Sequence, residues 1–336
     1  MISKRIKIII PILVICCLLL VVYFWIGIYQ SKESGSAKSV TFSIQRGEGS
    51  REIALNLEKV GLIKWESSFR VYVYFKGVAG KLQAGDYQIS PSMNIPEMVN
   101  KFVNGDVIKE KITFPEGFNL KEIKKSFESS EFLQTIDLEK LKIIDFKDEF
   151  DFLNDLPDEA SLEGFLFPDT YFFESDMKER EIAEIFLNNF EKKLTPYRPA
   201  FSGTDAGLTL FNVIKMASLI EKEVITYEDK EIVSGIFWKR LKSGKPLQSC
   251  ATVAYILNTT KRQYSFEETR IVSPYNTYLN LGLPSGPICN PGLESILAAL
   301  YPEASEYWYF LSTPEGKTIF SKTFEEHNIA KAKYLR

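Results

Sequence analysis

The sequence of 336 residues contains a single histidine, His327, and only four cysteines. With so few imidazole and thiolate ligands a structural zinc site is not expected, and no carboxylate cluster has the spacing of a calcium-binding loop. No nucleophile motif accompanies His327, so a Ser-His-Asp or Cys-His catalytic site is not expected either. We therefore predict neither a metal nor a cofactor, and we interpret His327 as a structural or supporting residue.

A strong excess of charge of one sign is also missing. The net charge of -3 gives no electrostatic reason to expect binding to nucleic acid. Hydrophobic residues make up 45% of the chain, which is enough for a sizeable core, and the length suggests roughly two domains. The 25 phenylalanines and 16 tyrosines fill that core or, in part, stack on sugar rings; composition leaves both interpretations open.

An uncharged, apolar stretch occupies residues 8–28. As a helix, this stretch would be about 31 Å long, which is enough to cross the hydrocarbon core of a membrane. Lys4, Arg5 and Lys7 precede it, and no signal-peptide cleavage site follows it. Because basic residues remain on the cytoplasmic side, we predict a cytoplasmic tail (1–7), one span of the cell (inner) membrane, and an extracytoplasmic or periplasmic remainder.

Aromatic residues are enriched at membrane interfaces. Three stand at the outer end of this span: Tyr23, Trp25 and Tyr29. Cys16 and Cys17 lie inside it, after the bulky Ile15, where lipoprotein processing would need a small residue. We interpret both cysteines as apolar anchor residues.

A polar linker (29–39) leads to a small α+β segment (40–106). Its hydrophobic periodicity predicts a strand, two helices, a strand and a short final helix, with Ser50 as the N-cap of the first helix. The corresponding ranges are 40–44, 50–60, 67–75, 84–89 and 95–104. The order of these elements is similar to a LysM-type fold, a module that commonly binds glycan; a spacer domain without affinity for sugar is the alternative.

The remaining segment (107–336) is predicted to be a mixed α+β domain. A strand at 109–114 precedes helix-like segments, and a hairpin and a helix close the chain. The helices are expected at 119–128, 179–194, 208–224 and 226–242, and the hairpin at 307–321. The predicted fold class is therefore α+β, with an N-terminal single-pass helix, a small LysM-like domain and a larger mixed domain.

Two carboxylates interrupt the apolar stripe of the helix expected at 208–224. A carboxyl group beside an apolar surface has the raised pKa that acid/base chemistry on a glycosidic bond requires. Helical spacing places Glu221 near the centre of the stripe and Glu223 at its edge. Either could be the acid by this criterion, and both could also be solvent-facing charges.

Other polar residues could form a saccharide-binding surface. Gln248 offers a donor and an acceptor for sugar hydroxyl or acetamido groups. Tyr275, Asn276 and Tyr278 lie on a proline- and glycine-rich segment that provides rings for stacking and an amide for hydroxyl groups. Glu163 is a further candidate carboxylate. A solvent-exposed loop is the alternative for Gln248, and turn chemistry explains the prolines and glycines but not the run of tyrosines.

Taken together, these segments resemble the endolytic murein transglycosylases of the MltG (YceG-like) family. The resemblance spans nearly the whole chain and depends on several short motifs in a fixed order. The motifs are FPEG (114–117), LEGFLFPDTY (162–171), ASLIEKE (217–223), PLQ (246–248), SPYNTY (273–278), GLP (282–284) and HN (327–328).

The resemblance implies an activity. The second acid of the Glu-Lys-Glu run, Glu223, would be the catalytic residue of a lyase that cleaves between N-acetylmuramic acid and N-acetylglucosamine and leaves a 1,6-anhydro end. Gln248, Tyr275, Asn276 and Tyr278 would line the groove for peptidoglycan glycan strands. The family also implies partnership with wall-synthesising enzymes, because the cut ends the elongation of a nascent strand.

Two departures from the family pattern place cysteines in groove-forming segments, at Cys250 and Cys289. Both are expected on the oxidising side of the membrane, so we predict a disulfide between them. Two alternatives to the lyase are a non-catalytic, membrane-tethered scaffold that binds peptidoglycan and a hydrolase that pairs Glu223 with a second carboxylate such as Glu163.

Overall fold

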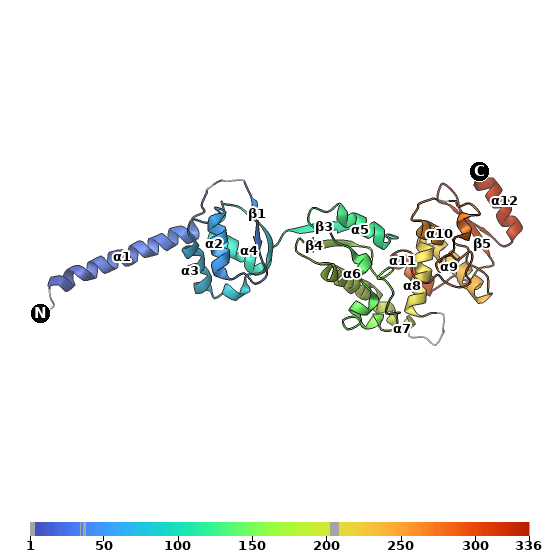
Figure 1. The fold of residues 1–336 in the computed structure, drawn as a ribbon, viewed down its shortest axis with the longest axis horizontal. Helices are drawn as coiled ribbons and strands as arrows, with labels where there is room; N and C mark the ends of the chain where they lie inside the picture. The colour runs from blue at the N-terminus through green and yellow to red at the C-terminus, as the bar shows by residue number, and fades with distance from the viewer. Residues whose placement is uncertain (1–3, 34, 36–37, 202–207, 262, 336) are drawn as a thin grey trace. The chain divides into compact units, whose positions relative to one another are not determined.

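The computed structural model describes residues 4–33, 35, 38–201, 208–261 and 263–335 (Figure 1). The chain packs as two compact units. The first contains Met1–Glu110 and Phe172–Met177, and the second contains Lys111–Tyr171 and Lys178–Arg336. The sequence pattern does not reveal that the short segment Phe172–Met177 packs with the first unit.

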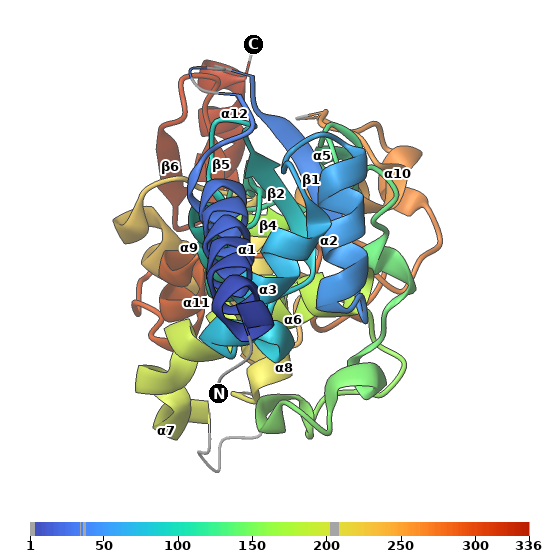
Figure 2. The same ribbon diagram turned by 90° about the vertical axis from the view of Figure 1, so that its left-hand side faces the viewer.

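The first unit begins with helix α1 (Lys4–Tyr29). Within it, Ile9–Tyr29 has a mean hydropathy of 3.0 and is the one helix of the described residues that is long and apolar enough to cross a membrane. The side chains of residues 9–22 are exposed, whereas Gly27 and Ile28 are buried against the rest of this unit. Figure 2 turns α1 toward the viewer.

A two-stranded antiparallel sheet and three helices complete the first unit. Phe42 of one strand lies opposite Tyr87 of the other. The elements are β1 (Val40–Ile44), α2 (Ser50–Lys59), α3 (Glu66–Lys76), β2 (Gly85–Ile89) and α4 (Ile95–Asn104). The predicted elements are all present, but Ser50 is the first helical residue of α2 and not its N-cap. The N-cap is Gly49, whose N–H donates to the Glu52 carboxylate at 3.0 Å.

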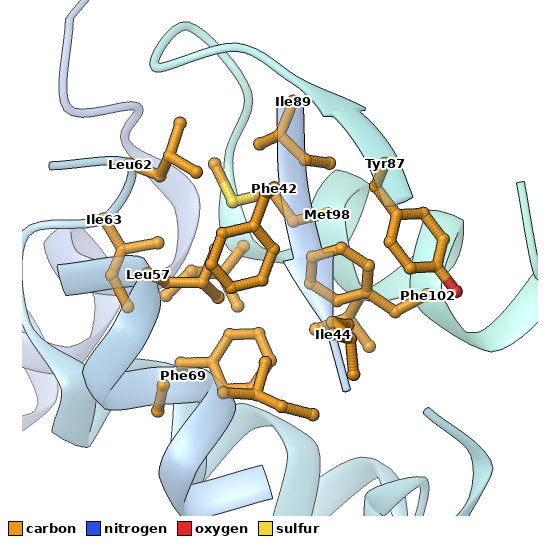
Figure 3. Packing of buried hydrophobic residues seen from close by; sticks show 14 of the residues in the cluster. Phe42, Ile44, Leu57, Leu62, Ile63, Phe69, Tyr87, Ile89, Met98 and Phe102 are labelled. Atoms are coloured by element: carbon orange, nitrogen blue, oxygen red, sulfur yellow. The ribbon is translucent and has the colours of Figure 1, made fainter. Parts of the chain in front are cut away.

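The core of the first unit is built around aromatic rings from both strands and two helices (Figure 3). The ring of Phe102 on α4 lies 4.8 Å from that of Tyr87 and 5.9 Å from that of Phe42. The Tyr87 hydroxyl donates to the Gln83 carbonyl at 2.8 Å, so this ring is buried without leaving its polar end unpaired. Phe69 of α3 closes the cluster.

Helices dominate the second unit. A ribbon of β3 and β4 lies at its start and the β5–β6 hairpin near its end, and these pairs form separate two-stranded sheets. The elements are β3 (Lys109–Thr113), α5 (Leu120–Glu128), β4 (Thr170–Glu174), α6 (Glu179–Leu194), α7 (Arg198–Phe201), α8 (Leu210–Glu221), α9 (Tyr227–Lys242), α10 (Cys250–Leu257), α11 (Leu293–Leu300), β5 (Tyr309–Ser312), β6 (Thr318–Ser321) and α12 (Phe324–Tyr334). The prediction of a mixed α+β fold is confirmed.

Helix α8 is the centre of the second unit and packs against α9 and α11. Its apolar side chains from Val213 to Ile220 are completely buried. The helix ends at Glu221, and Lys222 is its C-cap. Helix α8 is therefore shorter than the expected range of 208–224, and Glu223 lies in the turn that follows it. Helical spacing cannot predict the direction of Glu223, because this residue is not helical.

Candidate active site

An open cleft with a volume of about 1570 Å³ lies in the second unit. Helices α9, α10 and α12, the β5–β6 hairpin and the turn after α8 all contribute to its lining. Among the residues proposed from the sequence, Glu221, Glu223, Gln248 and Tyr278 border this cleft. The structure thus brings together side chains that are separated by more than 50 positions in the chain.

The Glu223 carboxyl group lies at the N-terminal end of α10. The Ser249 hydroxyl donates a hydrogen bond to Glu223 Oε1, and the backbone N–H of Ala251 also contributes. Ser249 is the N-cap of α10, but its hydroxyl does not cap the helix. The Glu223 carboxylate takes the position that an N-cap side chain normally fills, which suits a negative charge because helix N-termini carry partial positive charge.

Two opposing effects set the protonation of Glu223. Burial of its carboxyl group is the larger effect and raises its pKa above the ordinary value. The hydrogen bonds from Ser249 and Ala251 and the positive charge of Arg240 lower the pKa and offset part of this increase. A carboxyl group whose pKa is raised by burial and partly offset by donors can both give and accept a proton, as an acid/base catalyst must.

The charge near Glu223 comes from a half-buried arginine, Arg240. Arg240 of α9 donates to the backbone carbonyl of Leu247 at 2.7 Å and to that of Trp308 at 2.6 Å. These bonds fix the loop before α10 and the segment before β5 on either side of the cleft. The Ser312 hydroxyl donates to the Glu223 carbonyl oxygen at 2.9 Å and holds the backbone of the turn. No motif or spacing in the sequence predicts the roles of Arg240, Ser249 or Ser312.

Glu221 has a different environment, although it also borders the cleft. Its Oε2 accepts hydrogen bonds from the Gly292 N–H at 3.0 Å and the Ser295 hydroxyl at 2.6 Å. Its Oε1 lies 3.6 Å from Nζ of Lys230, whose side chain is only 3% exposed. Glu221 therefore balances a buried charge and holds the start of α11, which favours Glu223 as the acid available to a substrate.

Gln248 adopts a backbone conformation that is rare for its residue type. Its φ is 51°, in the left-handed region, and its N–H donates to the Thr277 carbonyl at 3.1 Å. The Tyr278 hydroxyl lies 3.0 Å from Sγ of Cys250 at the border of the same cleft. The segment that contains Tyr278 and the loop that contains Gln248 are thus joined beside Glu223.

The structure places Tyr275 and Asn276 outside the lining of the cleft. Asn276 is completely buried, and its side-chain nitrogen donates to the carbonyls of Thr269 and Ile271 at 3.0 and 2.8 Å. The Tyr275 ring packs on that of Tyr255 with centroids 5.0 Å apart. Contrary to the sequence prediction of direct contacts in this cleft, Asn276 shapes the loop because its amide must satisfy buried carbonyl groups.

Glu163 also lies outside the cleft lining and is only 2% exposed. It accepts hydrogen bonds from the Leu120 N–H and the Asn290 side-chain nitrogen, both at 3.1 Å. Burial raises the pKa of Glu163 to about 8. Its position is structural and not that of a second carboxylate facing the cleft beside Glu223.

Asn290, which the sequence did not single out, joins three segments. Its Oδ1 accepts from the N–H groups of Gly164 and Leu166 at 2.8 and 2.9 Å, and its Nδ2 donates to the Phe118 carbonyl at 2.9 Å. The N–H of Gly117, in the 114–117 motif, donates to the Asn290 backbone carbonyl at 2.9 Å. The motifs 114–117 and 162–171 therefore both bond to Asn290. These contacts join both motifs to the segment before α11.

The predicted disulfide is not formed, because all four cysteines of the chain, which lie within the described residues, are free. Sγ of Cys289 is buried and donates to the Ser218 carbonyl of α8 at 3.3 Å, whereas Sγ of Cys250 contacts Tyr278. The two cysteines lie in different environments, one in the core and the other at the cleft. The expectation of a Cys250–Cys289 bond is corrected accordingly.

His327 borders the cleft from α12, and its ring stacks on that of Tyr309 with centroids 5.3 Å apart. Burial and the nearby charges of Lys331 and Arg240 lower the pKa of His327 to about 4, so the imidazole is neutral at neutral pH. Within the part of the chain that the structure describes, no group of three or more His, Cys, Asp or Glu residues is placed to hold a metal ion.

Comparison with known proteins identifies the family. Residues 42–333 match the model of the YceG-like family. The chain belongs to the YceG-like family. It is 33% identical over 320 residues to the endolytic murein transglycosylase of Bacillus subtilis (strain 168), an alignment that covers 90% of this chain and 87% of that protein. It is 30% identical to the endolytic murein transglycosylase of Streptococcus pneumoniae serotype 2 (strain D39), with 88% of this chain and 58% of that longer protein covered.

A solved structure has the same fold. The crystal structure of a YceG-like protein from Listeria monocytogenes is 33% identical in sequence and superposes with a TM-score of 0.54. The match covers 88% of this chain and all of that one. The YceG-like resemblance inferred from the motifs is confirmed.

Proposed function

We propose that this YceG-like protein is an endolytic peptidoglycan lytic transglycosylase that uses Glu223 as its catalytic acid and base. The main supporting observation is the Glu223 carboxyl group at the border of the cleft, with a pKa raised by burial and a hydroxyl donor from Ser249. The names of the relatives support the same reaction class, since both are endolytic murein transglycosylases.

In the proposed reaction, protonated Glu223 donates its proton to the oxygen that links N-acetylmuramic acid to N-acetylglucosamine. The bond between that oxygen and C1 of the N-acetylmuramic acid breaks. The resulting carboxylate then accepts the proton of the C6 hydroxyl, and O6 of the same sugar attacks C1. Glu223 ends protonated, no water is consumed, and the product carries a 1,6-anhydro ring.

A single carboxyl group is sufficient for this outcome, whereas glycoside hydrolysis normally requires a pair. The two other candidate acids are engaged elsewhere. Glu221 is paired with Lys230 and bonded to α11, and Glu163 is buried and bonded to Leu120 and Asn290. These positions favour a lyase over a two-carboxylate hydrolase.

The cleft also offers groups that suit a glycan strand. Gln248 would contact hydroxyl or acetamido groups, and the Tyr278 ring would provide an apolar surface beside them. Tyr275 and Asn276 would act indirectly, by holding the loop that presents Tyr278. The neutral imidazole of His327 stands at the α12 side of the same cleft.

Helix α1 would anchor the enzyme in the cell membrane, with the remainder of the chain on the outer side. The small unit (40–106) would be a LysM-like domain, and both a glycan-binding role and a spacer role are consistent with it. Cleavage of nascent strands near the membrane would end their elongation, so wall-synthesising enzymes are the proposed partners.

Digestion of purified glycan strands tests the reaction. We expect the wild-type protein to release products with anhydro ends, which are lighter by one water than reducing ends. Glu223→Gln is expected to lower the rate by roughly 10²- to 10⁴-fold, the usual contribution of a general acid. Glu221→Gln is the matched control and should retain activity per folded molecule.

The other outcomes separate the alternatives. Reducing ends would indicate a hydrolase, and the absence of cleavage by the wild-type protein would favour a peptidoglycan-binding scaffold. Full activity of Glu223→Gln would show that the catalytic residue is assigned incorrectly.

A further inference from the structure

Helix α1 does not lead into a freely hinged domain. The Tyr23 ring stacks on that of Trp65, the residue before α3, with centroids 4.1 Å apart. At Gly27 a Cβ atom would lie 2.1 Å from Oγ of Ser68, so only glycine permits this close approach of α1 and α3. The residues between α1 and β1 were predicted to form a polar linker, and residues 34, 36 and 37 of it lie outside the described residues. The contact between α1 and α3 attaches the helix to the unit independently of this linker.

The segment of α1 that contacts α3 is also needed to cross the membrane. Residues 9–22, whose side chains are exposed, would extend only about 21 Å as a helix, whereas a hydrocarbon core is about 30 Å thick. Part of the following segment, up to Tyr29, must therefore lie in the membrane or at its boundary. Because Tyr23 and Gly27 contact the beginning of α3, this end of α3 must lie at the boundary as well.

The opposite end of α3 carries exposed aromatic side chains. Phe75 is 83% exposed and Tyr74 is 79% exposed, and their rings lie 5.9 Å apart. Phe75 follows Ser68 by seven residues, almost two helical turns, so it lies on the side of α3 that faces α1 at Ser68. Figure 2 views the first unit from the α1 side, with α3 beside α1.

The charges around α3 fit the same surface. Residues 64–81 contain four basic side chains and one acidic one, Glu66, which pairs with Arg70 at 3.4 Å. Lys76 lies 5.8 Å from the centre of the Tyr72 ring. Exposed aromatic rings interleaved with basic residues are typical of helices that lie in a membrane interface and contact anionic headgroups.

We propose that α3 is an interfacial helix that docks the first unit on the phospholipid bilayer crossed by α1. Phe75 and Tyr74 enter the headgroup layer, and Trp65 lies at the point where α1 leaves the hydrocarbon. This proposal depends on the membrane anchoring proposed above but not on the catalytic role of Glu223. Its consequence is that the small unit lies directly on the membrane surface, whatever the flexibility of the chain between α1 and β1.

Photo-crosslinking of the full chain in vesicles of phosphatidylethanolamine and phosphatidylglycerol tests the proposal. A benzophenone amino acid is introduced at one position at a time, and the adducts are identified by mass spectrometry. Leu19, exposed in the middle of α1, reports the anchor. Phe75 reports the docking of α3, and Val40, an exposed residue of β1, is the matched control. Strand β1 lies on the side of the first unit away from α1 (Figure 1).

We expect lipid adducts at positions 19 and 75 and only background at position 40. All three side chains are exposed, and an unchanged melting temperature would show that each variant folds. Lipid adducts at 19 without lipid adducts at 75, or protein adducts at 75 in their place, would overturn the docking proposal and leave the anchor intact. An absence of lipid adducts at 19 would reject the anchor and the docking together.

Discussion

The hydrogen bond from Ser249 to Glu223 leads to a quantitative prediction for the substitution Ser249→Ala. This bond favours the ionised carboxylate and therefore lowers the pKa of Glu223 against the larger effect of burial. A hydrogen bond to a charged group contributes about 1.5–3 kcal/mol. Because the hydroxyl can also bond to the neutral acid, we use the lower value. Removal of the bond should therefore raise the pKa of Glu223 and favour the protonated carboxyl group about tenfold over the ionised one.

The direction of the effect on activity follows from the role of Glu223. The proposed first step needs the protonated acid, so activity falls as the pH rises through the pKa of Glu223. In Ser249→Ala the acid stays protonated to higher pH, so the alkaline limb of the kcat/KM profile should move to higher pH. Initial rates of release of anhydro-ended products from purified strands, measured over a pH series, provide the assay.

Ser312→Ala is the matched control for this experiment. Its hydroxyl also bonds to Glu223, but to the backbone carbonyl and not to the carboxyl group. We expect its alkaline limb to coincide with that of the wild-type protein. The reasoning would be refuted if the limb of Ser249→Ala did not move, or if it moved to lower pH.

Three further predictions concern the stability contributed by Glu221, Glu163 and His327. Glu221→Gln leaves the buried Lys230 without its nearest carboxylate. The substitution should therefore lower the free energy of unfolding, measured by denaturant titration, by about 3 kcal/mol. An unchanged free energy of unfolding would contradict the structural role of Glu221. Glu163 holds a proton in the folded state up to about pH 8 but ionises near its ordinary pKa of 4.5 in the unfolded state. The free energy of unfolding should therefore fall as the pH rises from 4.5 to 8. In a pH series of melting temperatures, Glu163→Gln should show a smaller fall than the wild-type protein. The pKa of His327 is lowered to about 4, so the free energy of unfolding should decrease as the pH falls from 6.5 toward 4. The imidazole NMR signals of this single histidine should titrate near pH 4. Titration near 6.5 would contradict its burial.

Local chemistry explains why most helices could be predicted from the sequence. Helix α4 has the bounds that were expected, 95–104, because both of its ends are defined by nearby residues. The Asn94 side chain accepts from the N–H of Glu97, and Gly105 adopts the left-handed conformation that ends the helix. Such signals need no tertiary contact.

The end of α8 shows where this reasoning stops. The apolar pattern continues to Val224, but the helix ends at Glu221, and α9 begins soon afterwards at Tyr227 with Thr226 as its N-cap. Hydrophobic periodicity records which side chains are buried, and a buried turn can continue the pattern of a buried helix. The contrast between the two acids depends on partners that are distant in sequence, Lys230 and Ser249, which a helical projection does not contain.

The same limit applies to the candidate binding residues. Tyr275, Asn276 and Tyr278 are almost adjacent in the sequence, yet only Tyr278 borders the cleft. The position of Asn276 was decided by two carbonyl groups of its own loop, and that of Glu163 by Asn290, more than 100 residues away. A motif identifies residues that a family retains. It does not distinguish the residues that contact a substrate from the residues that position them.

The left-handed backbone of Gln248 has a consequence for how this position would change under selection. A side chain at φ 51° adds strain of order 1 kcal/mol that glycine would not have. Selection for thermal resistance alone would therefore favour glycine at this position, whereas selection for glycan recognition would keep the amide. If Gln248 binds sugar as proposed, Gln248→Gly should yield a protein with a higher melting temperature and a lower turnover rate. The strained backbone of Gln248 would then be a case in which thermal stability is reduced in favour of activity.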